Sequence, residues 1–169
     1  MLTISPVIHW MILSVTSRLQ RVGERKRAIG SLCRTSMKKT GRSCSAVKLQ
    51  KTWLHHINFG QTGFGAFDGE RIIGFATVSH RIFGTAARYV QLVCFQISKE
   101  YRRQGIGRKL FSMVCEEARR LGADKLYISA HSSKESQAAY RALGCTPAEE
   151  INAELAAAEP FDIQMEYSL

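Results

Sequence analysis

A short basic stretch, Arg102 to Arg108, has the composition of a site for a phosphorylated ligand. It reads Arg-Arg-Gln-Gly-Ile-Gly-Arg and lies between an apolar run and a run with helical periodicity. In a turn that leads into a helix, the first backbone N–H groups have no intrahelical partner, and the helix dipole adds about half a positive charge. Gly105 and Gly107 let the backbone approach a ligand closely. Because three arginines add formal charge, we expect a diphosphate to bind here.

The glycine spacing excludes two common phosphate-binding motifs. A dinucleotide-binding turn needs G-x-G-x-x-G, but Leu110 occupies the third glycine position, and the G-K-[S/T] of a P-loop is absent. The remaining pattern is R-x-x-G-x-G, from Arg102 to Gly107. It resembles the acyl-CoA loop of the GNAT N-acetyltransferase superfamily, which follows a strand.

A second block, from His131 to Cys145, is similar to the other GNAT signature. In that signature a polar residue follows the fifth strand, and the next helix ends in tyrosine followed by x-x-Leu-Gly. Tyr140 matches the tyrosine. Ser133 stands where the family usually has Asn, and Cys145 stands where it usually has Phe. The resemblance covers about residues 62–169.

The resemblance implies an α/β GNAT fold. Its central sheet is mixed and mostly antiparallel, is splayed between strands four and five, and is flanked by helices. We therefore expect a single domain over residues 1–169, in which residues 62–169 form the acyl-CoA-binding core. The order of strands and helices along the chain agrees with such a sheet.

The resemblance also implies the co-substrate, acetyl-CoA, and the residues that bind it. Where strands four and five part, strand four would offer backbone groups to the pantetheine arm and polarise the thioester carbonyl. The basic loop would hold the pyrophosphate, and Ser133 would bond the pantetheine or the sulfur region. The implied binding residues are Phe95, Gln96, Ile97, Arg102, Arg103, Gln104, Gly105, Ile106, Gly107, Arg108 and Ser133.

Tyr140 matches the family tyrosine that donates a proton to the departing CoA sulfur. A phenol suits this role because its reference pKa of about 10 keeps it protonated at neutral pH. The sequence gives no equally clear general base. Strand four offers only glutamines, and Ile128 stands where ribosomal-protein alanine acetyltransferases have Glu, which argues against that subfamily. His131 and a water relay are the remaining candidates.

Periodicity predicts the elements around these motifs. Asp68-Gly69 predicts a hairpin turn. Ser132 with Glu135 predicts a capping box at the start of the following helix, and Gly144 predicts its end. The last nine residues alternate between apolar and polar and predict a half-buried strand. The expected strands are 63–67, 71–79, 89–97, 125–130 and 161–169. The expected helices are 46–57, 106–121, 149–158 and the one between the Ser132 cap and the Gly144 stop.

The positive charge belongs to the first third of the chain. Residues 1–60 hold 11 Lys and Arg against one acidic residue, whereas residues 61–169 hold 13 of each. A partner should therefore not be inferred from the overall charge, and nucleic acid is not the expected ligand of the core. Residues 1–45 show no sustained period, and a leader, a disordered arm or a poorly conforming first strand with helices are all compatible with them.

We therefore expect an N-acetyltransferase that acts on an amine, either a small molecule or a peptide. Two alternatives are an acyl-CoA-binding regulator with little catalysis and a nucleic-acid-associated protein that uses the basic N-terminal segment. No apolar run is long enough for a membrane span, and unpaired cysteines predict a reducing, cytoplasmic location. Adjacent His55 and His56 do not share a helix face, so we expect no metal site. A homodimer is compatible with the resemblance.

Overall fold

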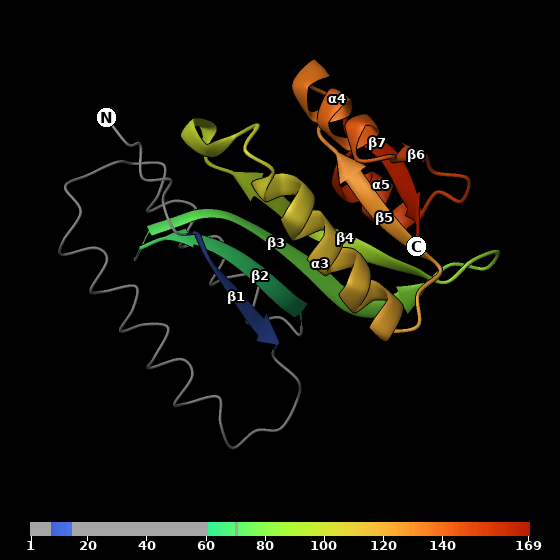
Figure 1. Cartoon of the computed structure of the whole chain (residues 1–169). Coiled ribbons are helices and arrows are strands. Elements are labelled where there is room, and N and C mark those ends of the chain that lie inside the picture. The colour runs from blue at the N-terminus through green and yellow to red at the C-terminus, as the bar shows by residue number, and fades with distance from the viewer. Residues whose placement is uncertain (1–7, 15–60, 70) are drawn as a thin grey trace.

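The computed structural model describes residues 8–14, 61–69 and 71–169. Seven strands form one sheet in the order β1-β2-β3-β4-β5-β7-β6 (Figure 1). Neighbouring strands are antiparallel except β4 and β5, which are parallel. This is the expected mixed α/β sheet. The strands are β1 Ile8–Ser14, β2 Gln61–Asp68, β3 Arg71–Phe83, β4 Tyr89–Ile97, β5 Lys125–Ala130, β6 Thr146–Pro147 and β7 Ile163–Ser168.

Three α-helices and one 3-10 turn connect the described strands. Helix α3 follows β4 and lies across one face of the sheet, whereas α4 and α5 lie on the side of β5, β6 and β7 (Figure 1). Gly122, in the left-handed region with φ 84°, ends α3 as expected, and Gly144 with φ 95° follows α4 in the same way. The helices are α3 Ile106–Arg120, α4 Lys134–Ala142 and α5 Ala153–Ala158, and the 3-10 turn η1 is Lys99–Tyr101.

The core lies between α3 and the sheet. The apolar face of α3 contributes Leu110, Val114 and Ala118, none of which is exposed to solvent. They pack on the inward side chains of β3, β4 and β5, such as Val90 and Leu126. Burying a side chain of this size removes about 1.5–3 kcal/mol of unfavourable exposure to water, so this contact fixes α3 on the sheet.

A β-bulge in β4 changes which side chains face α3. Val78 pairs with Leu92 and the preceding Thr77 pairs with Cys94, so Val93 is an extra residue in β4. Leu92 belongs to the core under α3, and beyond the bulge Phe95 packs on the same core. The bulge thus keeps the end of β4 apolar toward α3 and turns Cys94 to the opposite face.

Several elements differ in detail from the sequence prediction. The N-cap of α4 is Ser133 and not Ser132, because the Ser133 side chain accepts the hydrogen bond from the N–H of Ser136. Helix α5 begins only at Ala153, after the Asn152 cap, because the preceding Glu150 carboxylate is bonded to the backbone of Thr85 and Ala86 instead.

The last strand also differs from its simple alternation. It spans Ile163–Ser168, and Glu166 on its polar face is 3% exposed while Ile163 on its apolar face is 43% exposed. Glu166 is buried because Tyr89 and Lys125 hydrogen-bond to it, and no pattern of apolar residues can reveal such a partner.

The N-terminal part is described only at β1. Of the alternatives that the sequence left open for residues 1–45, the structure shows a first strand, which pairs with β2 from Ile8 to Ser14. The helix expected at 46–57 and the His55–His56 pair lie outside the described residues. No helix in the described part of the chain combines the length and apolarity that crossing a bilayer requires.

Candidate functional site

The site is organised around an opening between β4 and β5. These strands pair only at their first three positions, from Tyr89 with Lys125 to Gln91 with Tyr127. Beyond these positions no pair joins β5 to β4, while β5 is paired with β7 along its whole length (Figure 1). The splay expected between the fourth and fifth strands is therefore present. It leaves Phe95, Gln96 and Ile97 on a strand edge that has no ladder bonds to β5, and such an edge can bond an extended ligand.

The basic loop is anchored to the β2–β3 hairpin. The Ser98 N–H donates to the Ile73 carbonyl at 2.8 Å, and the Tyr101 hydroxyl donates to the Asp68 carboxylate at 2.6 Å. The bond to Asp68 is the main reason that the pKa of Tyr101 is raised, so this contact persists at neutral pH. The loop is thus held at the open end of β4.

The side chains of the loop fall into two groups. Arg102 Nε donates to the Ile97 carbonyl at 3.3 Å, and Gln104 Nε2 donates to the Glu100 carbonyl at 3.1 Å. These two residues brace the loop. Arg103 and Arg108 are exposed, and no described residue forms a hydrogen bond or an ion pair with either. Both guanidinium groups are therefore available to an anion.

The start of α3 presents backbone donors beside these arginines. Gly105 is the N-cap with φ 82°, a left-handed conformation that favours glycine, and no side chain caps the helix. Ile106 is buried, so it can offer a ligand only its backbone N–H. A Cβ on Gly107 would lie 3.5 Å from the Phe95 ring, an ordinary contact. The structure therefore brings the end of β4, the loop and the helix start together.

Tyr140 lies across the opening from the end of β4. Its ring centroid is 6.0 Å from that of Phe95. Burial raises its pKa, and the neighbouring Cys145, Cys94 and Asp162 raise it further in that order. No described residue hydrogen-bonds to the Tyr140 hydroxyl. The side chain is thus a protonated phenol at neutral pH, next to the edge of β4 that the splay leaves open.

Ser133 and His131 use their polar atoms within the protein. Ser133 Oγ caps α4, while its N–H donates to His131 Nδ1 at 3.1 Å. In the neutral imidazole an accepting Nδ1 places the proton on Nε2, so neither nitrogen is then free to take another proton. This arrangement does not favour His131 as a general base.

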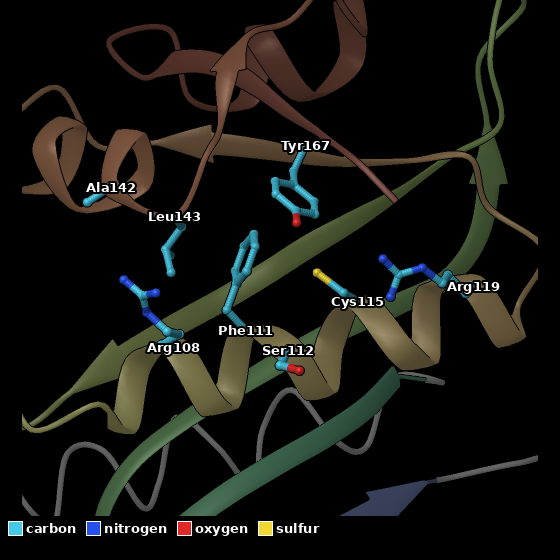
Figure 2. Close-up of a pocket in the computed structure, with 8 residues that line it drawn as sticks. All are labelled: Arg108, Phe111, Ser112, Cys115, Arg119, Ala142, Leu143 and Tyr167. Atoms are coloured by element: carbon cyan, nitrogen blue, oxygen red, sulfur yellow. The ribbon is translucent and has the colours of Figure 1, made fainter.

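A pocket of about 260 Å³ lies beside this site, between α3 and the β7 side of the molecule (Figure 2). The guanidinium groups of Arg108 and Arg119 stand at its two ends, and Phe111 points toward the Tyr167 ring. Because Arg108 also belongs to the loop, the pocket and the loop are continuous. Its lining residues are Arg108, Phe111, Ser112, Cys115, Arg119, Ala142, Leu143 and Tyr167.

A buried polar cluster closes the opposite end of the opening. The Tyr89 hydroxyl donates to Glu166 at 2.6 Å, and Lys125 Nζ donates to Glu166 and Glu149 at 2.6 Å each. Burial works to raise the pKa of Glu166, but the bonds from Lys125, Tyr89 and the Glu149 N–H outweigh it and lower the pKa. Burial together with Glu166 raises the pKa of Tyr89 to about 12. The cluster ties β4, β5 and β7 together where the strands converge.

Two further acidic residues, Glu159 and Asp162, lie in the turn between α5 and β7 and were not assigned a role from the sequence. The signal that could have found them is the segment 148–162, which holds five acidic residues and no Lys or Arg. In the described part of the chain, no cluster of His, Cys, Asp and Glu has the composition of a metal site.

Comparison with known proteins identifies this arrangement. The sequence profile of the acetyltransferase (GNAT) family matches residues 32–145, about two thirds of the chain. No curated protein sequence matches. Several solved structures share the fold. Because their sequence identities to this chain are below 25%, the similarity supports a common fold and nothing more.

An acetyltransferase from Streptococcus agalactiae 2603 has a TM-score of 0.59 at 16% identity, over 95% of this chain and 98% of its own. A GNAT-family acetyltransferase from Staphylococcus aureus Mu50 has 0.56 at 18% identity, over 95% and 99%. The PaiA N-acetyltransferase from Thermoplasma acidophilum, solved with coenzyme A, has 0.56 at 16% identity, over 95% and 99%.

Proposed function

The chain belongs to the GNAT family of acetyltransferases, and on this premise we propose that it transfers the acetyl group of acetyl-CoA to a primary amine. The observation that carries the proposal is the opening between β4 and β5, with the basic loop at its mouth and Tyr140 across from Phe95. Acetyl-CoA is a phosphorylated nucleotide joined to a long amide-containing arm, and the two parts need different surfaces. The loop suits the first part and the free edge of β4 suits the second.

The pyrophosphate would lie over the loop. Arg103 and Arg108 are the unpaired cations, and the N–H groups from Ile106 onward point out of the helix start. Arg102 and Gln104 would act mainly by holding the loop, since their side chains bond backbone carbonyls. The pantetheine amides would bond the backbone of Phe95, Gln96 and Ile97 as an added strand does.

The acetyl transfer would proceed by direct attack. A neutral amine adds to the thioester carbonyl, and a backbone N–H of β4 would stabilise the charge that develops on the oxygen. The carbon–sulfur bond then breaks, and Tyr140 gives its phenolic proton to the departing thiolate. The raised pKa of Tyr140 keeps the phenol protonated at neutral pH, so that the proton is present when the thiolate forms. Ser133 Oγ accepts the capping bond from the Ser136 N–H, so its hydroxyl hydrogen could still donate to the pantetheine or the sulfur region.

We further propose that residues 1–169 act as one domain in a reducing, cytoplasmic compartment. The thiols Cys94, Cys115 and Cys145 are free, which suits such a compartment. No specific observation favours the two alternatives, an acyl-CoA-binding regulator and a nucleic-acid-associated protein. The basic N-terminal segment lies largely outside the described residues, and an unpaired phenol at the opening favours catalysis over binding alone.

The test combines binding with turnover. Calorimetry should show that acetyl-CoA binds and that desulfo-CoA, which lacks only the sulfur, binds within a few-fold of CoA. A panel of amines, followed by release of free CoA thiol, should include at least one acceptor with turnover. Binding without turnover on any amine would support the regulator instead, and absence of acetyl-CoA binding would overturn the proposal.

A further inference from the structure

The one buried residue of α4 is polar. Gln137 is 7% exposed, and every other residue of the helix is half-buried or exposed. A helix of nine residues is marginal on its own in water, so its position depends on contacts with the rest of the protein. The side chain of Gln137 is therefore a main determinant of where α4 lies.

The Gln137 amide joins α4 to the end of β5. Its Nε2 donates to the His131 carbonyl at 3.1 Å and, at the longer distance of 3.4 Å, to the Ala130 carbonyl. The amide nitrogen suits two carbonyl acceptors because it carries two donors, whereas both carbonyls would repel the amide oxygen. In the described part of the chain, no other side chain of α4 hydrogen-bonds to β5 or to the residue that follows it.

The carbonyls that Gln137 bonds lie where β5 has already separated from β4. The last pair between the two strands is Gln91 with Tyr127, and β5 ends beyond it at Ala130. Ala130 is 0% exposed and pairs with Ile163 of β7, so this end of β5 is fixed in the sheet. Gln137 thus ties α4 to a fixed point on one side of the opening.

Tyr140 depends on this attachment for its position. It follows Gln137 by three residues, so the two side chains lie on the same face of α4. No described residue hydrogen-bonds to the Tyr140 hydroxyl, and its ring packs on that of Phe95 with 6.0 Å between centroids. The hydroxyl is therefore placed by this packing and by the position of the helix. A shift or rotation of α4 on β5 would move the phenol relative to the edge of β4.

Stability alone does not account for a glutamine at this position. Gln137 Oε1 is buried and accepts no hydrogen bond from any described residue. A buried polar atom without a partner costs about 1–3 kcal/mol. An apolar side chain of the same length, such as methionine, would fill the space without this cost. What the glutamine adds is two directional bonds to fixed carbonyls.

We propose that Gln137 is a positioning residue for the acetyl transfer. By bonding the carbonyls of Ala130 and His131, it holds α4 where the Tyr140 hydroxyl can reach the departing CoA sulfur. A displacement of about 1 Å in a reacting group can lower a rate about 100-fold, so two modest bonds are enough to control turnover. This inference rests on the proposed function and deepens it by naming what sets the geometry of the general acid.

Hydrogen exchange tests the attachment without any acceptor. Gln137→Met keeps the length of the side chain but removes both bonds, so amides of α4 should exchange about 10-fold faster while those of α3 stay unchanged. Gln164→Met is the matched control, because the Gln164 amide also bonds through both ends, to Ser129 and Asp162, and bonds nothing in α4. It should leave exchange in α4 at the wild-type rate. Unchanged exchange in α4 of Gln137→Met would overturn the proposal, whatever the turnover.

Steady-state kinetics tests the link to Tyr140, with acetyl-CoA and the fastest acceptor of an amine panel that includes spermidine, tyramine and glycinamide. Gln137→Met should lower kcat about 10-fold or more. The Kd for acetyl-CoA, measured by calorimetry, should stay within about twofold, because the basic loop and the edge of β4 form no hydrogen bond with Gln137. Gln137→Glu, which keeps the shape but lacks the two donors, should lose at least as much of kcat.

A double-mutant cycle separates positioning from a general loss of structure. In a Tyr140→Phe background, Gln137→Met should change kcat by less than about twofold, since the group that it misplaces is already absent. Normal kcat in Gln137→Met, or an equal loss of kcat in both backgrounds, would overturn the positioning role and leave acetyl transfer standing. A wild type that binds acetyl-CoA but acetylates no amine of the panel would support the regulator, and the positioning role would fall with the proposed function.

Discussion

The rings of Phe95 and Tyr140 approach to 6.0 Å between centroids, one from the end of β4 and the other from the helix after β5. Strand β4 and the helix after β5 lie on the two sides of the gap where β4 and β5 separate. The pair therefore bridges the opening, with an apolar ring on one side and a phenol on the other. A thioester lying on the β4 edge would have its sulfur beside the only group of this pair that can donate a proton.

Replacing Tyr140 with Phe should separate chemistry from binding. The ring still packs on Phe95, so acetyl-CoA affinity by calorimetry should stay within a few-fold. Turnover should fall about 10²–10⁴-fold, because the thiolate then leaves without a positioned acid. The raised pKa of Tyr140 also predicts that the wild-type kcat does not decline on the alkaline side up to pH 10. Near-normal turnover in the variant would reduce Tyr140 to a packing residue.

Gly107 tests the loop. A Cβ here meets the Phe95 ring at 3.5 Å and Ile97 at 3.8 Å, so Gly107→Ala should bind acetyl-CoA within a few-fold of the wild type. Gly107→Glu adds length and negative charge where the pyrophosphate should lie, and affinity should fall about 10-fold or more. Comparing the two variants separates the effect of the longer, negatively charged side chain on affinity from the effect of a Cβ alone. Equal affinities in both, with folding verified by circular dichroism, would refute the loop assignment.

Glu166 should stabilise the fold rather than act in catalysis. Glu166→Gln weakens charge-assisted bonds to Tyr89 and Lys125 and should lower the free energy of unfolding at pH 7 by about 1.5–3 kcal/mol. The pKa of Glu166 in the folded protein is lowered from 4.5. The ionised carboxylate therefore makes its full contribution to the free energy of unfolding above that pH, and this contribution is lost as the pH falls below it. Urea titrations should thus show a smaller difference in the free energy of unfolding between the wild type and Glu166→Gln at pH 4 than at pH 7. A constant difference at both pH values would contradict this account.

The N-terminal strand should matter for stability more than for the cofactor. A chain that begins at Ser45 lacks β1 and exposes the edge of β2, which otherwise pairs over seven positions. We expect a lower melting temperature and a greater tendency to aggregate. Acetyl-CoA affinity should persist, since β4, the loop and α4 make no strand pair with β1. Loss of binding in a folded shortened chain would show that the N-terminal part contributes to the cofactor site.

The sequence reveals the parts of this protein whose cause is local. The strand from Tyr89 to Ile97 and the end of α3 at Gly122 follow from periodicity and from the conformational freedom of glycine, and both are confirmed. The splay between β4 and β5 was expected from the family resemblance alone. Such information is carried by neighbouring residues or by a recognisable motif.

The parts that escaped prediction depend on contacts between distant segments. Glu166 is buried through Tyr89, 77 positions away, and Glu150 delays α5 by bonding the β3–β4 connection 64 and 65 positions away. No local pattern distinguishes a carboxylate that is paired in this way from one that is solvated.

The extra residue in β4 is one that the pairing with β3 does not need. Before Val93 the even-numbered residues of β4 face α3, and after it the odd-numbered residues do. Leu92 and Phe95 therefore lie on the same surface of the sheet. Deleting Val93 would leave every pair beyond it in place, because Leu92 and Cys94 already face the consecutive residues Val78 and Thr77, and Phe95 would stay on the α3 side. Loss of this single codon should therefore leave the β3–β4 pairing intact and remove the local bend and twist that a bulge introduces.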